Sequence, residues 1–197
     1  MRRHFVLFAF GALALFAARR TAALPGPVGD VSERALGAFD DALYSAVGLR
    51  LMSGRWLEAA ERPENAELVS AMRAAEDRYS IPRDLVVRLA WQEARFRVDA
   101  YNAGSGASGV MQIVPRWHPG VDPFEPFAAI DYGARYLAQL RRQFGTWELA
   151  LKGYNWGPGN VQGWLTAGRP ADAEPLETSN YSSQILADLS EAGRAVA

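Results

Sequence analysis

A glutamate occupies an apolar position of a predicted helix. In the segment RDLVVRLAWQE, a helical repeat of about 100° per residue places Val86, Leu89, Ala90 and Glu93 on one face. A carboxyl group held among apolar neighbours loses hydration, so we expect its pKa to rise. A carboxylic acid that stays protonated near neutral pH can act as a general acid on a glycosidic oxygen. The same spacing also fits an exposed Glu93 that pairs with Arg97 one turn later.

Several other catalytic chemistries are excluded by composition. The 197 residues contain no cysteine, which removes disulfides, thiolate metal sites and cysteine nucleophiles. The two histidines are His4 and His118, and a Ser-His-Asp triad would need His118 without any Gly-x-Ser-x-Gly turn to support it. No histidine cluster could close a zinc site, so we expect no metal. The net charge of −1 predicts no nucleic-acid partner.

Helical spacing dominates the elements that must position these residues. Apolar residues recur three and four apart, and neither strand-like alternation of useful length nor a fixed repeat is present. Pro82 is expected at a first helical position, with Asp84 in the first turn and the helix end near Arg95. Thr146 is expected to cap a helix that ends near Tyr154, before Gly157-Pro158-Gly159. The remaining predicted helices cover 31–56, 64–79, 129–144 and 182–192, and the predicted loops cover 101–109 and 117–126.

The N-terminal segment has the pattern of an export signal. A basic head precedes 14 uncharged residues, 5–18, which as a helix would span about 21 Å, less than the roughly 30 Å of a bilayer core. Arg19 and Arg20 follow that run, so a retained membrane anchor is an alternative, and a buried core helix is another. We therefore divide the chain into a signal peptide or anchor (1–23), a linker and N-terminal helix (24–62) and a catalytic domain (63–197). Removing residues 1–23 would remove four arginines and change the net charge from −1 to −5.

Three motifs stand in an ordered series around Glu93. They are QEARF at 92–96, GASGVMQIVP at 106–115 and ALKGYNWGPG at 150–159. This set resembles the soluble lytic transglycosylase (SLT) domain family, which has a lysozyme-like fold and cleaves peptidoglycan. Two further segments are similar to the family's connecting helix and closing motif, namely FEP at 124–126 and ETSNY at 177–181. The match runs from about residue 78 to 186.

The resemblance implies a fold and a reaction. The fold would be mainly α-helical, like goose-type lysozymes and lytic transglycosylases. Glu93 would be the sole general acid and base: it would protonate the oxygen between N-acetylmuramic acid and N-acetylglucosamine, and its carboxylate would then take the proton of the muramoyl C6 hydroxyl. That hydroxyl would close onto C1 as a 1,6-anhydro product, with assistance from the substrate's own N-acetyl group. No water would be consumed, and no metal or organic cofactor would be required.

The resemblance also assigns substrate contacts. Gln112 and Met111 would line the cleft beside the acid, with Gln112 bonded to the sugar. Tyr154 would lie near Glu93 or the N-acetyl group, Asn155 would shape its turn, and Tyr181 would close the far wall. For each of these residues, packing in the core is the alternative. Trp117 and Trp156 could stack on sugar faces, although burial explains them equally well.

The chain departs from the family pattern near the acid. Ala94 stands where the family has serine, so any contact from that hydroxyl is missing. The stretch from Glu93 to Gly109 is one residue longer than the common form, Gly153 replaces alanine, and Val110 replaces leucine. These departures bear on rate and substrate register more than on reaction class.

Two other functions are compatible with the sequence. A hydrolytic lysozyme of the same fold would need a second acid to position water, and Asp99 and Glu125 are the nearby candidates in sequence. A non-catalytic, wall-binding component of an envelope-spanning machine is the other. We expect peptidoglycan glycan strands as partner, a periplasmic or envelope location, and membrane contact only through the N-terminal segment. The small size also suggests local wall opening for a secretion system, pilus, flagellum or phage particle.

Overall fold

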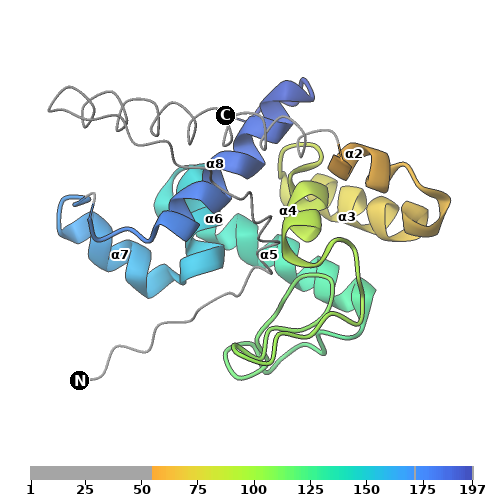
Figure 1. Ribbon diagram of the computed structural model, residues 1–197, viewed down its shortest axis with the longest axis horizontal. Helices are drawn as coiled ribbons and strands as arrows, with labels where there is room; N and C mark the ends of the chain where they lie inside the picture. The colour runs from red at the N-terminus through yellow and green to blue at the C-terminus, as the bar shows by residue number, and fades with distance from the viewer. Residues whose placement is uncertain (1–54, 171, 197) are drawn as a thin grey trace, which may run out of the picture.

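The computed structural model describes residues 55–170 and 172–196, and this part of the chain is helical (Figure 1). Its β structure is limited to two isolated bridges, Tyr101 with Ser108 and Ser108 with Ile113. The prediction of a mainly α fold is confirmed. The helices are α2 (Arg55–Ala60), the 3-10 helix η1 (Pro63–Asn65), α3 (Ala66–Tyr79), α4 (Leu85–Ala94), α5 (Pro126–Phe144), α6 (Trp147–Trp156), α7 (Pro158–Thr166) and α8 (Leu176–Glu191).

The predicted export segment, 1–23, lies outside the described residues. So does most of the helix predicted for 31–56, of which only Arg55 and Trp56 are described, at the start of α2. The described helices include none with both the length and the apolar character that crossing a bilayer requires. The division into 1–23, 24–62 and 63–197 therefore stays a prediction.

Two helices near the C-terminus differ from the predictions. Gly157-Pro158-Gly159 ends α6, as expected, but it also starts α7, which was not predicted. Gly157 takes a φ of 91°, and Pro158 is at the first helical position, where its missing N–H and preset φ cost nothing. The last helix begins at Leu176, six residues before the predicted Ser182. Its first turn carries Glu177 and Thr178 instead of an apolar stripe, so the spacing of apolar residues did not predict it.

The helix that carries Glu93 is at the centre of the described residues. α4 contacts α3 and α2 on one side and α8 on the other (Figure 1). Its side chains at Leu85, Val86, Val87, Leu89 and Ala90 are all fully buried. Burial of an aliphatic side chain contributes about 1.5–3 kcal/mol, so packing on both sides holds this short helix in place.

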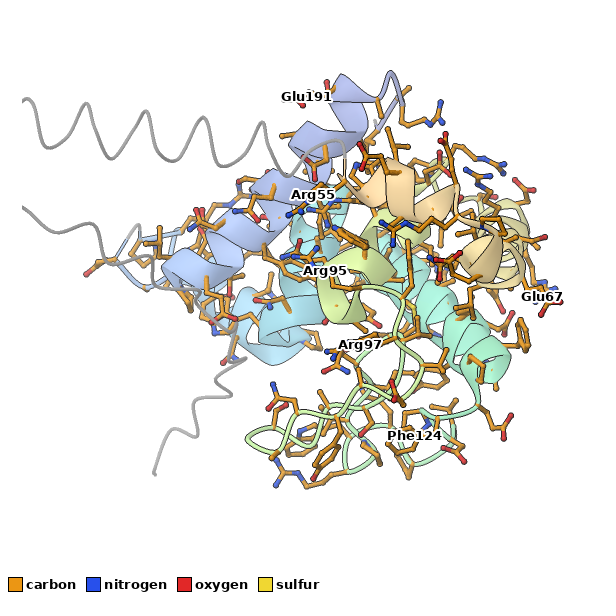
Figure 2. All side chains as sticks on the ribbon, turned by 45° about the vertical axis from the view of Figure 1, so that its right-hand side comes forward. Arg55, Glu67, Arg95, Arg97, Phe124 and Glu191 are labelled. Carbon is orange, nitrogen blue, oxygen red and sulfur yellow. The ribbon has the colours of Figure 1, made fainter. Side chains whose placement is uncertain are left out.

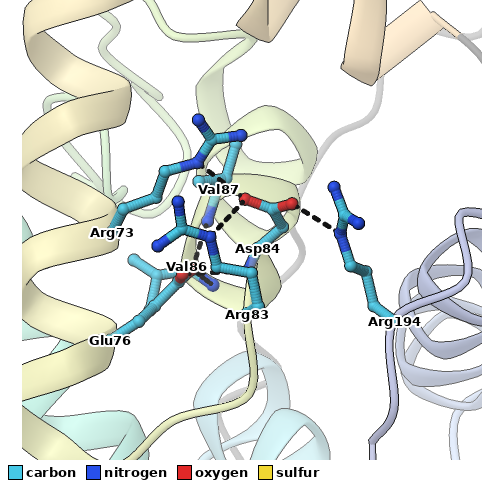
Figure 3. Close-up of polar contacts among 7 residues, drawn as sticks. All are labelled: Arg73, Glu76, Arg83, Asp84, Val86, Val87 and Arg194. Atoms are coloured by element: carbon cyan, nitrogen blue, oxygen red, sulfur yellow. Dashed lines mark hydrogen bonds and ion pairs between the residues drawn. The ribbon is translucent and has the colours of Figure 1, made fainter.

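Glu76 of α3 holds the first turn of α4 (Figure 3). Its carboxylate accepts hydrogen bonds from the backbone N–H groups of Asp84 and Val86, both at 2.8 Å, and of Val87 at 3.3 Å. These donors have no partner within the helix. Burial raises the pKa of Glu76 to about 7, although the three backbone bonds favour the charged form.

Asp84 does not take the place expected for it. It precedes α4 with a left-handed φ of 65°, and Pro82 lies outside the helix. The Asp84 carboxylate is fully buried and pairs with Arg73 of α3 and Arg194 beyond α8, each at 2.8 Å. The carboxyl group that accepts the N–H groups at the start of α4 is thus that of Glu76 from a neighbouring helix, and Asp84 ties α3 to the C-terminal segment (Figure 3).

The long connection between α4 and α5 folds back on itself. Gly109 has a φ of 71°, and a Cβ at that position would lie 1.7 Å from the carbonyl oxygen of Pro123. Only glycine allows this approach. It brings the GASGVMQ segment against the residues that lead into α5. Gln112 of this segment lines the same cavity as Glu93 at the end of α4.

Candidate active site

Glu93 lies in the last turn of α4 and faces a cavity. We call this cavity of about 600 Å³ the acid pocket; besides Glu93 its lining includes Gln92, Arg95, Arg97, Tyr101, Asn102, Gln112, Asn155 and Tyr181. The α4 helix ends directly after Glu93, because Arg95 and Phe96 take left-handed φ values of 54° and 62°. This end exposes one side of the carboxyl group to the pocket.

The environment of Glu93 keeps it protonated at neutral pH. Burial raises the pKa of the Glu93 carboxyl to about 8, and the nearby charge of Glu177 adds to the increase. A hydrogen bond from Tyr181 acts in the opposite direction. The predicted rise in pKa is therefore confirmed, and the predicted alternative, a pair with Arg97, is wrong: the Arg97 Nε donates instead to the carbonyl of Ala94 at 3.3 Å.

Tyr181 of α8 is the hydrogen-bond partner of the acid. Its hydroxyl donates to Oε1 of Glu93. Burial and the neighbouring Glu93 raise the pKa of Tyr181 well above its ordinary value, so the phenol remains a donor. Tyr181 was expected to form the far wall of the cleft, with Tyr154 nearer the acid; the structure gives the direct contact to Tyr181.

Tyr154 forms part of the cleft floor, and Met111 lies beneath it. The Tyr154 hydroxyl donates to the backbone carbonyl of Met111 at 2.9 Å. The Met111 side chain is fully buried and lies against Gly133 of α5, rather than on the cleft wall where it was expected. The two residues therefore support the floor of the site.

Gln112 and Asn155 stand where the acid pocket meets a second cavity. Both residues line the two cavities, as Gly104 does. The Gln112 Nε2 donates to the carbonyl of Gly109 at 2.9 Å, which leaves its Oε1 as an acceptor. Asn155 Oδ1 accepts a hydrogen bond from Thr178 at 2.9 Å, which leaves its amide N–H groups as donors.

The second cavity, of about 930 Å³, has aromatic walls. We call it the aromatic pocket; its lining includes Trp117, His118, Tyr132, Tyr136, Tyr154 and Trp156. His118 Nδ1 lies 2.8 Å from the Tyr132 hydroxyl, and burial lowers the pKa of His118, so the imidazole is neutral at physiological pH. Trp117 remains 62% exposed, which leaves its ring free to stack on a ligand. Together the two cavities form one cleft that can hold an extended chain.

Sequence reasoning missed the second carboxyl group near the acid. Glu177 comes one turn before Tyr181 on α8, burial raises its pKa, and its Oε1 is buried without a hydrogen-bond partner in the part of the chain that the structure describes. The four-residue spacing to Tyr181 was the available signal. Asp99 and Glu125, the acids suggested by sequence, are exposed and do not line the acid pocket. Among the described residues, no group of His, Asp and Glu side chains is arranged to hold a metal ion.

The family comparison agrees with this geometry. Residues 70–175 match the model of the transglycosylase SLT domain. The chain belongs to the SLT family. Glu93, Met111, Gln112, Tyr154 and Asn155 all lie inside the matched SLT region, whereas Tyr181 lies beyond it.

Solved structures of SLT proteins are similar to this chain. Soluble lytic transglycosylase SLT70 from Escherichia coli is 29% identical over 60% of this chain and 23% of its own, with a TM-score of 0.53. An inactive mutant of lytic transglycosylase Slt from Pseudomonas aeruginosa is 26% identical over 63% and 24%, with a TM-score of 0.52. A 70-kDa soluble lytic transglycosylase in complex with bulgecin A is 27% identical over 78% and 28%, with a TM-score of 0.55. The chain spans about a quarter of the length of these proteins.

Proposed function

We propose that this SLT-family chain is a peptidoglycan lytic transglycosylase. It would cleave the β-1,4 bond between N-acetylmuramic acid and N-acetylglucosamine without water and leave a 1,6-anhydro end. The observation that carries the proposal is a carboxyl group held protonated at neutral pH, with its pKa near 8, at the wall of a cleft long enough for a glycan strand. The matches to lytic transglycosylases support the same reaction.

Glu93 would perform both proton transfers. As a neutral acid it protonates the glycosidic oxygen, and the resulting carboxylate keeps the hydrogen bond from Tyr181. That carboxylate then takes the proton of the C6 hydroxyl, whose oxygen closes onto C1. Gln112 and Asn155, with a free acceptor and free donors on the cleft surface, would bind the sugar.

Glu177 supports hydrolysis as a second candidate function. A second carboxyl group near the acid could position a water molecule, which is the arrangement that glycoside hydrolysis requires. Hydrolysis and transglycosylation differ by one water in the mass of the product. Mass spectrometry of digested sacculi therefore separates the two.

The deciding experiment compares wild type with Glu93→Gln. We expect wild-type protein to release anhydro-muropeptides from purified sacculi and Glu93→Gln to release none while its thermal unfolding stays unchanged. Glu67→Gln, at an exposed position of α3, serves as the matched control and should keep full activity. Full activity of Glu93→Gln would refute the assignment, and reducing ends in place of anhydro ends would establish the lysozyme alternative.

We further propose an envelope location with local wall opening. Residues 1–23 would act as an export signal or anchor, and an assembly such as a secretion system, pilus, flagellum or phage particle would deliver the enzyme. Fractionation of cells that express the full chain or the chain without residues 1–23 tests the location. We expect loss of envelope activity on deletion, and unchanged export would contradict the role of this segment.

A further inference from the structure

Two arginines that the proposed reaction does not use line the acid pocket. Arg95 and Arg97 follow the end of α4 and face the same cavity as Glu93. In Figure 2 they continue down one face of the molecule from Arg55. The proton transfers assigned to Glu93 require no positive charge in the acid pocket. The two arginines are therefore available to bind another group of the ligand.

Neither arginine bonds to the Glu93 carboxyl group: the side-chain hydrogen bonds of Arg95 and Arg97 go to backbone carbonyls of α4. The pKa of Glu93 responds to burial, to Tyr181 and to Glu177, and neither guanidinium contributes to it. A cation that served the glycosidic bond directly would lie close enough to lower that pKa. Arg95 and Arg97 line the acid pocket without bonding to the acid, which leaves them to contact a group of the ligand other than the glycosidic oxygen.

Both guanidinium groups keep donors for a ligand. Arg95 stacks on the Trp91 ring, 4.6 Å from its centroid, and its Nη1 donates to the Trp91 carbonyl at 3.2 Å. Arg97 uses its Nε on the Ala94 carbonyl. Within 55–170 and 172–196 neither arginine forms an ion pair, and the exposed Asp99 two residues on is not paired with Arg97. Each fork of five N–H groups thus retains most of its donors.

The surroundings of Arg95 concentrate positive charge. Burial lowers the pKa of Arg95, and the nearby charges of Arg88 and Arg55 add to the decrease. The one opposing charge is Asp188, which is bound to Arg88 at 2.6 Å. An anion in the acid pocket would relieve this repulsion.

The backbone turns to place these side chains. Arg95 and Phe96 are consecutive non-glycine residues with left-handed φ, a conformation that costs on the order of 1–3 kcal/mol each and persists where the surrounding structure enforces it. Phe96 is buried against Trp91, with ring centroids 5.6 Å apart, which fixes the turn. The turn directs residues on either side of Phe96 toward the pocket.

We propose that Arg95 and Arg97 form a carboxylate-binding site that recognises the acidic groups carried by the muramoyl residues of peptidoglycan. This rests on the proposed function, since it names what the substrate of that cleft must carry. Arginine suits the role because its planar fork binds a carboxylate through two parallel hydrogen bonds. The carboxylate is either the lactyl group of an unsubstituted muramoyl residue or an acidic group of its stem peptide.

The test measures binding by the full chain in a Glu93→Gln background, so that no turnover occurs. Three tetrasaccharides are titrated calorimetrically: peptide-free N-acetylglucosamine–N-acetylmuramic acid repeats, the same repeats with stem peptides, and neutral chitotetraose. Adding Arg95→Gln and Arg97→Gln should weaken the affinity for a carboxylate-bearing ligand by about tenfold or more, the value expected for lost charge-assisted hydrogen bonds. Chitotetraose should bind as before. Arg142→Gln, at an exposed site on α5, is the matched control and should change none of the three affinities.

The comparison of the three tetrasaccharides also identifies which group of the substrate supplies the carboxylate. A loss confined to the peptide-free ligand assigns the lactyl group, and a loss confined to the peptide-bearing ligand assigns the stem. An equal loss for chitotetraose, or no loss for any ligand, overturns the proposal. Should the double variant fail to fold, Arg97→Gln alone, at an exposed position, carries the same comparison. Binding needs no catalysis, so the two proposals fail separately. The carboxylate site can be absent while anhydro products still form, and the site can be present in a protein that forms no anhydro products.

Discussion

The hydroxyl of Tyr181 donates a hydrogen bond to the carboxyl group of Glu93 and joins α8 to the end of α4 across 88 residues of sequence. The contact brings together a proton donor that stays neutral and an acid whose pKa is near 8. Each proton that leaves Glu93 leaves a carboxylate that Tyr181 stabilises.

Tyr181→Phe removes this stabilisation. We expect the pKa of Glu93 to rise by about one unit and kcat to fall about tenfold, because one hydrogen bond to the carboxylate is lost. The measurement is the pH profile of glycan cleavage, whose basic limb should move to higher pH. Tyr154→Phe is the contrast, since its hydroxyl bonds to Met111 and not to the acid: activity can fall, but the limb should stay in place. An unshifted limb in Tyr181→Phe would contradict the role of its hydroxyl.

Glu76 makes the stability of the fold depend on pH. Its pKa is about 7 in the folded protein against an ordinary value of 4.5, so the folded state holds the proton more tightly than the unfolded state. The free energy of unfolding therefore falls as the pH rises from 4.5 to 7 and then levels off with respect to this group, a loss of about 3 kcal/mol. Glu93, whose pKa is about 8 in the folded protein, adds a further decrease in the free energy of unfolding up to about pH 8.

Urea unfolding across this range checks the effect of Glu76. Glu76→Gln should flatten the decline between pH 4.5 and 7, because no group then titrates at the start of α4. Glu67→Gln on the exposed side of the same helix should leave the slope as in wild type. Equal slopes in wild type and Glu76→Gln would exclude Glu76 as the source.

The ion pair between Arg88 and Asp188 fastens α4 to α8 below the site. Its atoms lie 2.6 Å apart, and both side chains are about 95% buried. Asp188→Leu leaves an uncompensated buried guanidinium, so we expect a loss of about 3–5 kcal/mol in the free energy of unfolding. The double variant Arg88→Met/Asp188→Leu should lose much less, because no buried charge remains.

Denaturant unfolding of the single and double variants tests this pair. The exposed pair of Arg78 and Asp131 provides the comparison, and Asp131→Asn should cost less than about 1 kcal/mol. A double variant as unstable as Asp188→Leu would mean that packing, and not the unpaired charge, causes the loss.

Gly133 allows α5 to approach the floor of the cleft. A Cβ at this position would lie 2.7 Å from the Met111 side chain and 3.1 Å from the Tyr154 hydroxyl. Gly133→Ala should therefore lower stability by about 1–3 kcal/mol and reduce activity through displacement of Tyr154. Gly163→Ala, in α7 with open space around it, should be neutral or slightly stabilising. Thermal unfolding and sacculus digestion of the two variants make the comparison, and equal behaviour would show that Gly133 is not constrained.

Local features of the site could be predicted from the sequence. The apolar face of α4 depends on neighbours three and four residues away, so the helical period placed Glu93 on that face and predicted a raised pKa, while an exposed Glu93 paired with Arg97 fitted the same period. The Thr146 cap is equally local, and its Oγ1 accepts the N–H of Leu149 at 3.2 Å as expected. The order of the three motifs was enough to identify the SLT family.

Tertiary packing decided the partners of Glu93. Whether Tyr154 or Tyr181 reaches the acid depends on how α6 and α8 pack against α4, which no local period encodes. The same packing buries Met111, brings Glu177 near the acid, and places Glu76 instead of Asp84 at the start of α4. The sequence thus predicted Glu93 as the candidate acid, because its helical position and the neighbouring motifs are local features of the chain. The packing of distant helices determined which groups stabilise the Glu93 carboxylate, because hydrogen bonds require contact in space.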